Sequence, residues 1–504
     1  MQSVTATSRC KYEFSDGMRN GPLSTALLVI FIALFCSDDV LGQAFEFSWD
    51  RATIYSIVTD QFHNGDPSND QAGRQTKEGV SSNVSSGPFG GDFAGIMAKI
   101  EDDYFGNLGV DAICISQVHP RSASNDRYSS IWSLDYSRIS PSYGTVDEFE
   151  RLVNTAHDRG LRVIMEVSLP QRTEELAVDS LSTENRQVIR EILDEKWGES
   201  GSEMTRSLVH YFDRSGYPVD SDYTTIKWLT DWVRNFGIDA FRIRDAEMVE
   251  TNLLSVLKAE GVGALRTWKS ENPTKSNDDL EFWLMAEVQN HGPVKSQYHD
   301  AGVDATANFS FANGDENLDA IYSDYSASIS SDPAFNMVSF VSSSASKLYE
   351  RTDLINAGTE LYLLPGVIQI FYGDETARPH GENNSEHGDL LSPMNWDDAD
   401  ETVRNHWSKL GQFRSQHPAV AAGVHELIDD NPYSFYRGVR IGANVDEIIV
   451  VMGATGRTQL NVRKYFPDDT ILRDAYTGKI SMVSFGEAAF EAGEHGVLLL
   501  ELVE

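Results

Sequence analysis

The sequence predicts an α/β protein built on a (β/α)8 TIM barrel, with a short inserted domain after the third strand and a C-terminal antiparallel β domain. Three observations lead to this prediction. Short apolar runs alternate with amphipathic stretches from about residue 52 to 420, a polar stretch follows the third run, and short strands separated by turns follow residue 423. Alternating strand and helix patterns indicate a parallel sheet, and a barrel accommodates more such units than most open sheets.

The predicted barrel strands are short, mainly apolar runs, and an eighth strand near residues 303–307 is the weakest of them. Amphipathic segments between the strands, such as 146–159 and 223–236, have apolar side chains on one face, as surface helices do. The chain of 504 residues exceeds the ~250 residues of a simple barrel, which leaves room for additions. The other seven predicted strands cover residues 53–58, 112–116, 162–167, 240–243, 283–288, 337–342 and 367–371.

These patterns also predict the domain boundaries. The chain divides into a signal peptide region (1–42), the first part of the barrel (43–169), an inserted excursion (170–222), the second part of the barrel (223–422) and a C-terminal β-sandwich domain (423–504). We see no internal repeat and no low-complexity linker that would suggest a different division.

The first segment is predicted to direct secretion. Residues 23–36 are apolar, Arg19 supplies a positive flank, and small residues precede a candidate cleavage site before Gln43. This run is shorter than the ~20 residues that span a bilayer, so we expect no stable membrane span and a secreted protein, periplasmic in a bacterium. A short signal anchor is the alternative, and Met18 is a second candidate start of translation.

The acidic composition argues against nucleic acid and anionic membranes as partners. Lys and Arg total 41 against 77 Asp and Glu, which gives a formal net charge of −36. Such a field repels phosphate backbones and anionic membranes, so nucleic acid is not expected as a partner. Cys10 and Cys36 fall in the signal region, and Cys114 lies in an apolar run, where we expect an unpaired core residue.

Several strings, in order from about residue 49 to the C-terminus, resemble the α-amylase family of glycoside hydrolases, especially its periplasmic and maltogenic branches. The resemblance implies a (β/α)8 barrel, a domain inserted after the third strand and a C-terminal β-sandwich, in agreement with the patterns above. The strings are 54–60 (IYSIVTD), 90–92 (GGD), 134–136 (LDY) with 144–145 (GT), 240–242 (AFR), 286–288 (AEV), 365–367 (PGV), 371–375 (FYGDE), 394–396 (MNW) and 410–414 (LGQFR).

Retaining glycosidases use two carboxylates ~5–5.5 Å apart, of which one attacks the anomeric carbon and the other protonates the leaving oxygen. In this family the nucleophile is an Asp two residues after an Arg on the fourth strand, and the acid is a Glu on the fifth. A second Asp, preceded by His after the seventh strand, supports the transition state. The resemblance places these roles at the carboxyl ends of the barrel strands.

Two of the three carboxylates are missing from this sequence. By resemblance Glu287 keeps the general-acid position and Arg242 is retained, but Arg244 stands at the nucleophile position and Ser344-Ala345 replaces His-Asp. A guanidinium stays protonated and cannot attack carbon. At ~4 Å and an effective dielectric of ~20, its repulsion of an oxocarbenium-like centre is about 4 kcal/mol, or roughly a thousandfold in rate.

The neighbouring Asp245 is an alternative nucleophile only if the fourth strand slips by one residue, which would invert every side chain on that strand. We instead expect Arg244 to pair with Glu287 or with Glu166 on the third strand. Such a pair would neutralise a buried carboxylate.

The sugar-binding surroundings are altered as well. Residues 129–132 read Ser-Ser-Ile-Trp where the family has His-Gly-Tyr-Trp, and Pro170 replaces the family's Asn, a ligand of its bridging calcium. By resemblance Trp132, Asp135 and Ser344 remain as candidate substrate-binding residues of a degenerate pocket.

One structural calcium site is predicted near the N-terminus of the barrel. Calcium prefers six to eight oxygen ligands from flexible loops, and residues 63–70 with 90–92 cluster Asn, Asp and Gly. A polar turn cluster without metal is the alternative. By resemblance to maltogenic enzymes and glucanotransferases, the ligands are Asn64, Asp66, Asn69, Asp70, the Gly90 carbonyl and Asp92.

The sequence therefore predicts a secreted, calcium-stabilised α-amylase-like pseudoenzyme with a binding, scaffolding or regulatory role, whose partner is an α-glucan or an unidentified protein. A residual hydrolase of starch or maltodextrin is one alternative. A membrane-tethered partner subunit, like the amylase-fold ectodomains that escort amino-acid transporters, is another.

Overall fold

The structure is a computed structural model that describes residues 45–70, 89–119, 139–169, 206–208, 210–217, 221–275, 278–314, 317–332, 334–344, 346–381 and 390–503. The predicted signal region, most of the predicted insert, Trp132, Asp135 and Ala345 lie outside the described residues.

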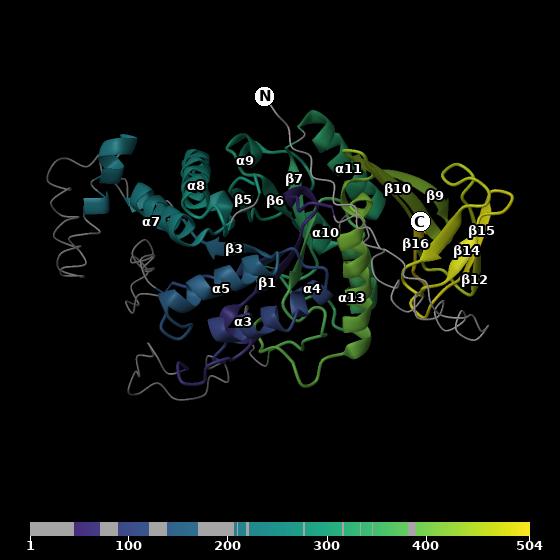
Figure 1. The fold of residues 1–504 in the computed structure, drawn as a ribbon, viewed down its shortest axis with the longest axis horizontal. Helices are drawn as coiled ribbons and strands as arrows, with labels where there is room; N and C mark the ends of the chain where they lie inside the picture. Colours follow the sequence, from purple (N-terminus) through teal and green to yellow (C-terminus); the bar gives the residue numbers. More distant parts are fainter. Residues whose placement is uncertain are drawn as a thin grey trace, which may run out of the picture. The chain divides into compact units, whose positions relative to one another are not determined.

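Eight parallel strands close into a barrel in sequence order, which confirms the predicted fold (Figure 1). The weak eighth candidate is β6, whose neighbours in the barrel are β5 and β7. The strands are β1 (Thr53–Ile57), β2 (Ala112–Ile115), β3 (Arg162–Val167), β4 (Ala240–Ile243), β5 (Trp283–Ala286), β6 (Ala305–Asn308), β7 (Asn336–Phe340) and β8 (Val367–Phe371).

Helices follow most of the strands and surround the barrel (Figure 1). The longer helices are α3 (Phe93–Glu101), α5 (Val146–Asp158), α7 (Ser221–Phe236), α8 (Thr251–Glu271), α11 (Leu318–Ser331), α12 (Leu354–Tyr362) and α13 (Glu401–Gln416). Short helical segments are η1 (Trp49–Arg51), α2 (Thr59–Phe62), α4 (Tyr104–Asn107), η2 (Ala246–Met248), α9 (Gln297–Asp300), α10 (Phe309–Asn313) and α14 (Ala419–Ala422).

Helix α5 illustrates how local sequence fixes an element. Thr145 and Glu148 form a complete capping box at its start, which satisfies otherwise unpaired backbone N–H groups. Phe149, Leu152 and Val153 are buried on the face that packs against the barrel. The cap and the apolar stripe together set both where the helix begins and which way it faces.

The barrel interior is packed with side chains that alternate with those facing the helices. Trp49 in η1 stacks on Trp283 at the start of β5, with ring centroids 4.7 Å apart. Cys114 is buried and unpaired, as predicted, and burial raises the pKa of its thiol to about 12. The other apolar interior residues include Ile54, Ala112, Ile164, Ala240, Met285, Ala305, Ala307, Val338 and Val367.

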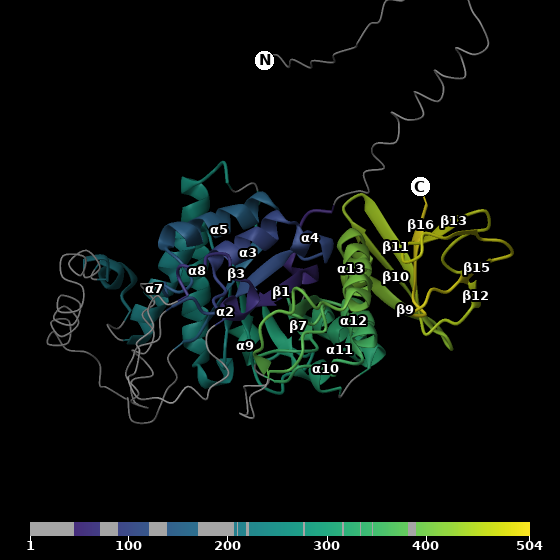
Figure 2. The same ribbon diagram turned by 90° about the horizontal axis from the view of Figure 1, so that it is seen from below.

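The C-terminal strands form the predicted antiparallel domain, with a six-stranded sheet ordered β14-β13-β16-β11-β10-β9 and a two-stranded sheet of β12 and β15. Figure 2 shows β9, β10, β11 and β16 side by side in the larger sheet. The strands are β9 (Val424–Asp430), β10 (Tyr433–Ile441), β11 (Asn444–Met452), β12 (Arg457–Asn461), β13 (Ile471–Asp474), β14 (Ile480–Met482), β15 (Glu487–Glu491) and β16 (Leu498–Leu502).

A buried arginine joins this domain to the barrel helices. The guanidinium of Arg437 in β10 donates hydrogen bonds to the carbonyl of Leu363, at 2.6 Å, and to the carbonyl of Val420. Because Arg437 is fully buried, these carbonyls take the place of water around its charge. Over the described ranges, no helix has the length and apolarity needed to cross a membrane.

Candidate active site

Three charged side chains meet inside the barrel at the carboxyl ends of β3, β4 and β5. Glu166 and Arg242 are paired in the β3–β4 register, and Glu287 directly follows β5. Arg242 donates from Nη1 to Glu166 Oε2 at 3.0 Å and from Nη2 to Glu287 Oε2. All three residues are buried, so one guanidinium bridges two carboxylates that water does not reach.

Burial and charge act in opposite directions on this cluster. Burial raises the pKa of Glu287, and the attraction of Arg242 opposes that shift without cancelling it. Burial also opposes the charged form of Arg242, but Glu287 and Glu166 more than offset the effect and raise its pKa. Oε1 of Glu287 is buried and has no hydrogen-bond partner among the described residues. The position assigned to a proton donor therefore has one oxygen bound to arginine and one oxygen free.

Arg244 lies just beyond the end of β4, two residues after Arg242. Its backbone N donates to the Val167 carbonyl at 3.1 Å, and its Nη1 lies 3.5 Å from Glu166 Oε1. Glu166 therefore contacts both arginines, and it is the partner of Arg244, while Glu287 pairs with Arg242. The Arg244 side chain is 33% exposed, so one side of its guanidinium faces solvent at the mouth of the barrel.

The fourth strand keeps the register that places Arg242 inside the barrel. Its neighbours Phe241 and Ile243 are fully buried in the core between the barrel and the helices. Asp245 has left the strand, because it adopts a left-handed backbone conformation (φ 49°) and precedes η2. The slipped register that would offer Asp245 as a nucleophile is therefore not adopted.

A second ion pair follows β7 and β8, and the sequence reasoning missed it. Arg351 Nη2 donates to Asp374 Oδ1 at 2.8 Å, and the Ser342 hydroxyl donates to the same oxygen at 2.7 Å. Asp374 belongs to the string at 371–375, which could have marked it as functional, but nothing in the sequence identifies Arg351 as its partner. Ser344 is partly exposed in the turn that follows Ser342.

The predicted calcium loop brings its residues together. The Oδ1 atoms of Asn64 and Asn69 are buried and have no hydrogen-bond partner among the described residues. Gly90 has a φ of +83°, and a Cβ there would lie 2.4 Å from Asp70 Oδ1, so the glycine leaves space beside that carboxylate. Unsatisfied buried oxygens next to a carboxylate fit a hard cation such as calcium.

Asp92 already accepts four hydrogen bonds. Its carboxylate accepts from the backbone N of Gly65 at 3.0 Å, of Asp66 at 2.7 Å and of Gly95 at 2.7 Å, and from Asn69 Nδ2 at 3.2 Å. It caps α3 and holds the loop in shape. Within the described ranges no three His, Cys, Asp or Glu side chains are grouped to hold a metal, so a site here needs Asn and backbone oxygens in addition to carboxylates.

Similarity to known proteins extends over most of the chain. A family profile described as "Alpha amylase, catalytic domain" matches residues 56–187. The periplasmic α-amylase of Escherichia coli (strain K12) is 30% identical to this chain over an alignment of 485 residues. The match covers 78% of this chain and 71% of that protein. This chain belongs to the α-amylase family.

This α-amylase family member is also similar to a glucanotransferase and to solved α-amylase structures. A cyclomaltodextrin glucanotransferase of Bacillus licheniformis is 23% identical over 485 residues, covering 86% of this chain and 63% of that protein. Among solved structures, the Anoxybacillus α-amylase aligns with a TM-score of 0.65 and 20% identity, covering 91% of this chain and 99% of the other. The Geobacillus thermoleovorans α-amylase, solved with acarbose, aligns with a TM-score of 0.63 and 19% identity, covering 91% of this chain and 100% of the other. At these identities the structures share the fold.

The structure therefore brings together part of the predicted site. Arg242 and Glu287 are in direct contact, and Arg244 joins them through Glu166. The roles assigned to these residues by resemblance stay predictions for this α-amylase family member, as do those of Ser344 and of the residues outside the described ranges.

Proposed function

We propose that this member of the α-amylase family is a pseudoenzyme that binds a ligand at the barrel mouth without cleaving it. The observation that carries the proposal is the position of Arg244, which pairs with Glu166 where the resemblance places the attacking carboxylate. A guanidinium has no electron pair with which to attack an anomeric carbon, so no glycosyl adduct can form on it.

The pairing of Glu287 supports the same conclusion. An acid that protonates a glycosidic oxygen must point a protonated oxygen at it. One oxygen of Glu287 instead accepts from Arg242, which also contacts Glu166. Two carboxylates and two guanidinium groups in contact balance each other's charge, which is typical of a structural ion-pair network.

Residual hydrolysis of starch or maltodextrin is the second candidate, and one observation favours it. Glu287 has a pKa raised by burial and a free Oε1, and a proton donor needs both a raised pKa and an unpaired oxygen. If this residue still acts as an acid, release of reducing ends from soluble starch will be measurable, and Glu287→Gln will abolish it.

The ligand at the barrel mouth is proposed to be an α-glucan or a protein partner. Calorimetric titration of the full chain with maltoheptaose separates the two, because an α-glucan bound at the barrel mouth contributes heat that a variant such as Arg244→Trp removes by filling the opening. Absence of heat at millimolar sugar excludes the α-glucan and supports the protein partner.

We further propose export of the mature chain, supported by the signal-like residues 1–42 and by similarity to a periplasmic α-amylase. Recovery of the protein outside the cytoplasm, with Gln43 at its N-terminus, is the expected result. Protein retained in the membrane fraction with residues 23–36 still attached would support the tethered partner subunit instead.

Calcium is proposed as a structural ion of the loop around Asn64. The free oxygens of Asn64 and Asn69, the carboxylates of Asp66 and Asp70 and the Gly90 carbonyl would hold it, with Asp92 shaping the loop. The ion would tie the segment after β1 to the start of α3. It has no part in the chemistry proposed for the barrel mouth.

A further inference from the structure

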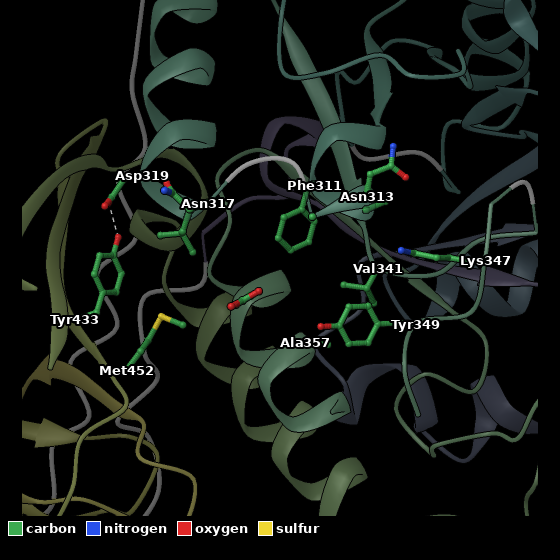
Figure 3. Close-up of a pocket in the computed structure, with 14 residues that line it drawn as sticks. Phe311, Asn313, Asn317, Asp319, Val341, Lys347, Tyr349, Ala357, Tyr433 and Met452 are labelled. Carbon is green, nitrogen blue, oxygen red and sulfur yellow. Dashed lines mark hydrogen bonds between the residues drawn. The ribbon is translucent and has the colours of Figure 1, made fainter. Parts of the chain in front are cut away.

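A second cleft, of about 780 Å³, opens outside the barrel (Figure 3). Its volume is within the ~300–1,000 Å³ typical of small-molecule sites. None of its described lining residues belongs to the charge cluster at the barrel mouth. Helices α10, α11 and α12, the loop after β7, and strands β10 and β11 contribute to it, through Phe311, Ala312, Asn313, Gly314, Asn317, Leu318, Asp319, Val341, Lys347, Tyr349, Ala357, Glu360, Tyr433 and Met452.

Three aromatic side chains line this cleft and are only partly buried: Phe311, Tyr349 and Tyr433. In Figure 3 Phe311 lies between the other two, so the rings are distributed along the cleft. The flat apolar face of an aromatic ring matches the C–H face of a pyranose ring, and the tyrosine hydroxyls leave a polar tip at the edge. A row of such faces suits a chain of several sugar units.

The Tyr433 ring is held in place before any ligand binds. Its hydroxyl donates to Asp319 Oδ1, an oxygen that also lies 3.1 Å from His425 Nε2. Met452 faces Tyr433 across the β10–β11 register and supports it from the neighbouring strand. A side chain that is already ordered loses less conformational entropy on binding, so its contact contributes more to affinity.

Tyr349 and Phe311 are fixed through their backbones. The Tyr349 N donates to Ser342 Oγ at 2.9 Å, and its carbonyl accepts from Arg351 Nε at 2.7 Å. Phe311 lies in α10, which Asn308 caps through its side chain. All three aromatic residues are therefore anchored by contacts within the protein, as expected of a preformed site.

The polar lining offers both donors and acceptors. Asn313, Lys347 and Glu360 are exposed, and in the described part of the chain their side chains take part in no ion pair or hydrogen bond. Asn317 caps α11 with its Oδ1, which leaves its amide N–H groups to donate. Each sugar hydroxyl can both donate and accept a hydrogen bond, so sugar hydroxyls can pair with both the donors and the acceptors of this lining.

The charges of the cleft exclude other ligand classes. Two carboxylates, Asp319 and Glu360, line it against the single ammonium of Lys347, in a chain with a net charge of −36. Phosphates, nucleotides and acidic polysaccharides are repelled by this field. A lipid would leave the amide, ammonium and carboxylate groups without partners, which is costly.

We propose that this cleft binds a neutral oligosaccharide, with successive sugar units against Tyr349, Phe311 and Tyr433 and their hydroxyls on Asn313, Asn317, Lys347 and Glu360. The site lies outside the barrel mouth and does not depend on the function proposed there. It would hold the protein on a glucan or another neutral polysaccharide, whether or not the barrel mouth binds sugar.

The test is calorimetric titration of the full chain with maltoheptaose and, separately, with cellohexaose, which differ in linkage. We expect binding of one of them. Tyr433→Ala and Tyr349→Ala should each raise Kd by roughly tenfold, the loss expected when one stacking contact is removed. Tyr433→Phe keeps the ring face and should stay within about threefold of the wild type.

Two controls separate this site from others. Phe485→Ala removes an aromatic ring that is 83% exposed on the C-terminal domain and lines no part of the cleft, so Kd should not change. Arg244→Trp fills the barrel mouth and should also leave cleft binding intact. If Tyr433→Ala does not fold, Tyr349→Ala and Lys347→Ala still test the cleft.

Two results overturn the proposal. The first is the absence of heat with both sugars at millimolar concentration. The second is wild-type binding that survives the cleft substitutions, which assigns the sugar to another site. If that binding is lost in Arg244→Trp, the barrel mouth is the sugar site, so failure of this inference is distinguishable from failure of the proposed function.

Discussion

The imidazole of His417 lies 2.7 Å from the carboxylate of Glu501, which ties the end of α13 to the last strand of the C-terminal domain. The other ring nitrogen lies 2.8 Å from Asp446 Oδ1. Burial opposes the charged imidazolium, but the two carboxylates outweigh burial and raise the pKa of His417 to about 9. At neutral pH a cation therefore links the two parts of the chain.

This link predicts a loss of stability at alkaline pH. Because the folded pKa of His417 is above its ordinary value of 6.5, its contribution is fully present below pH 6.5, falls between 6.5 and 9, and is lost above 9. The contribution is on the order of 3 kcal/mol. Urea unfolding at pH 6 and pH 9.5 should show the wild type losing this amount relative to His417→Gln. A difference between the two proteins that stays constant with pH would contradict the assignment.

Arg242→Met should destabilise the protein strongly. It leaves Glu166 and Glu287 buried without a shared cation, a loss that typically costs about 3–5 kcal/mol. The penalty should shrink at acidic pH, where the carboxylates become neutral. Arg244→Met is the matched control, because its partly exposed guanidinium makes one longer contact and Glu166 keeps Arg242, so about 1 kcal/mol or less is expected. Equal losses in the two variants would argue against the bridging role of Arg242.

We expect no covalent glycosyl intermediate. If the proposed function holds, incubation with an activated fluorosugar should add no sugar mass to any peptide, because the resemblance places Arg244 and not a carboxylate at the nucleophile position. Arg244→Asp combined with Ala345→Asp should restore little activity, since the altered residues at 129–132 and 170–171 remain. A sugar adduct found by mass spectrometry on wild-type protein would refute the pseudoenzyme proposal.

Removal of calcium should lower thermal stability. If the loop binds calcium at a hundredfold excess over Kd, the ion contributes about 2.7 kcal/mol, and EGTA should lower Tm by roughly 3 °C in a chain of this size. Asn64→Ala combined with Asp70→Ala should remove this response, because it deletes a free oxygen and the carboxylate beside Gly90. Asp429→Ala, an exposed acidic residue of β9, is the control and should respond as the wild type does. A Tm that is the same in EGTA and in excess calcium would count against the site.

The sequence was sufficient to predict the barrel because its strands alternate regularly with helices along the chain. Only β6 gave a weak signal, since Ala305 and Ala307 have low strand propensity and are chosen for their small size inside the barrel. In the site, the resemblance to the family placed Arg242 and Glu287 at strand ends. It did not show which carboxylate each arginine contacts, because that depends on side-chain reach across neighbouring strands.

Contacts between distant segments were beyond prediction from sequence patterns. The Arg351–Asp374 pair joins two loops, and Tyr433 joins Asp319 across 114 positions of the chain. Neither pair has a periodicity or motif of its own, so only the folded structure brings its members together. The second cleft was missed for the same reason, since its lining residues come from six separate elements and loops.

The guanidinium bridge between Glu166 and Glu287 also bears on how such a barrel could evolve. Bare carboxylates crowded at one end of a barrel repel one another, and active enzymes tolerate that strain because catalysis requires it. Here the carboxylate of Glu166 contacts two arginines and that of Glu287 contacts one. The charged groups at the barrel mouth therefore attract one another and stabilise the folded state. On the proposed function, hydrolysis regained by way of Arg244→Asp would first have to reintroduce that repulsion, so single substitutions would not readily restore it.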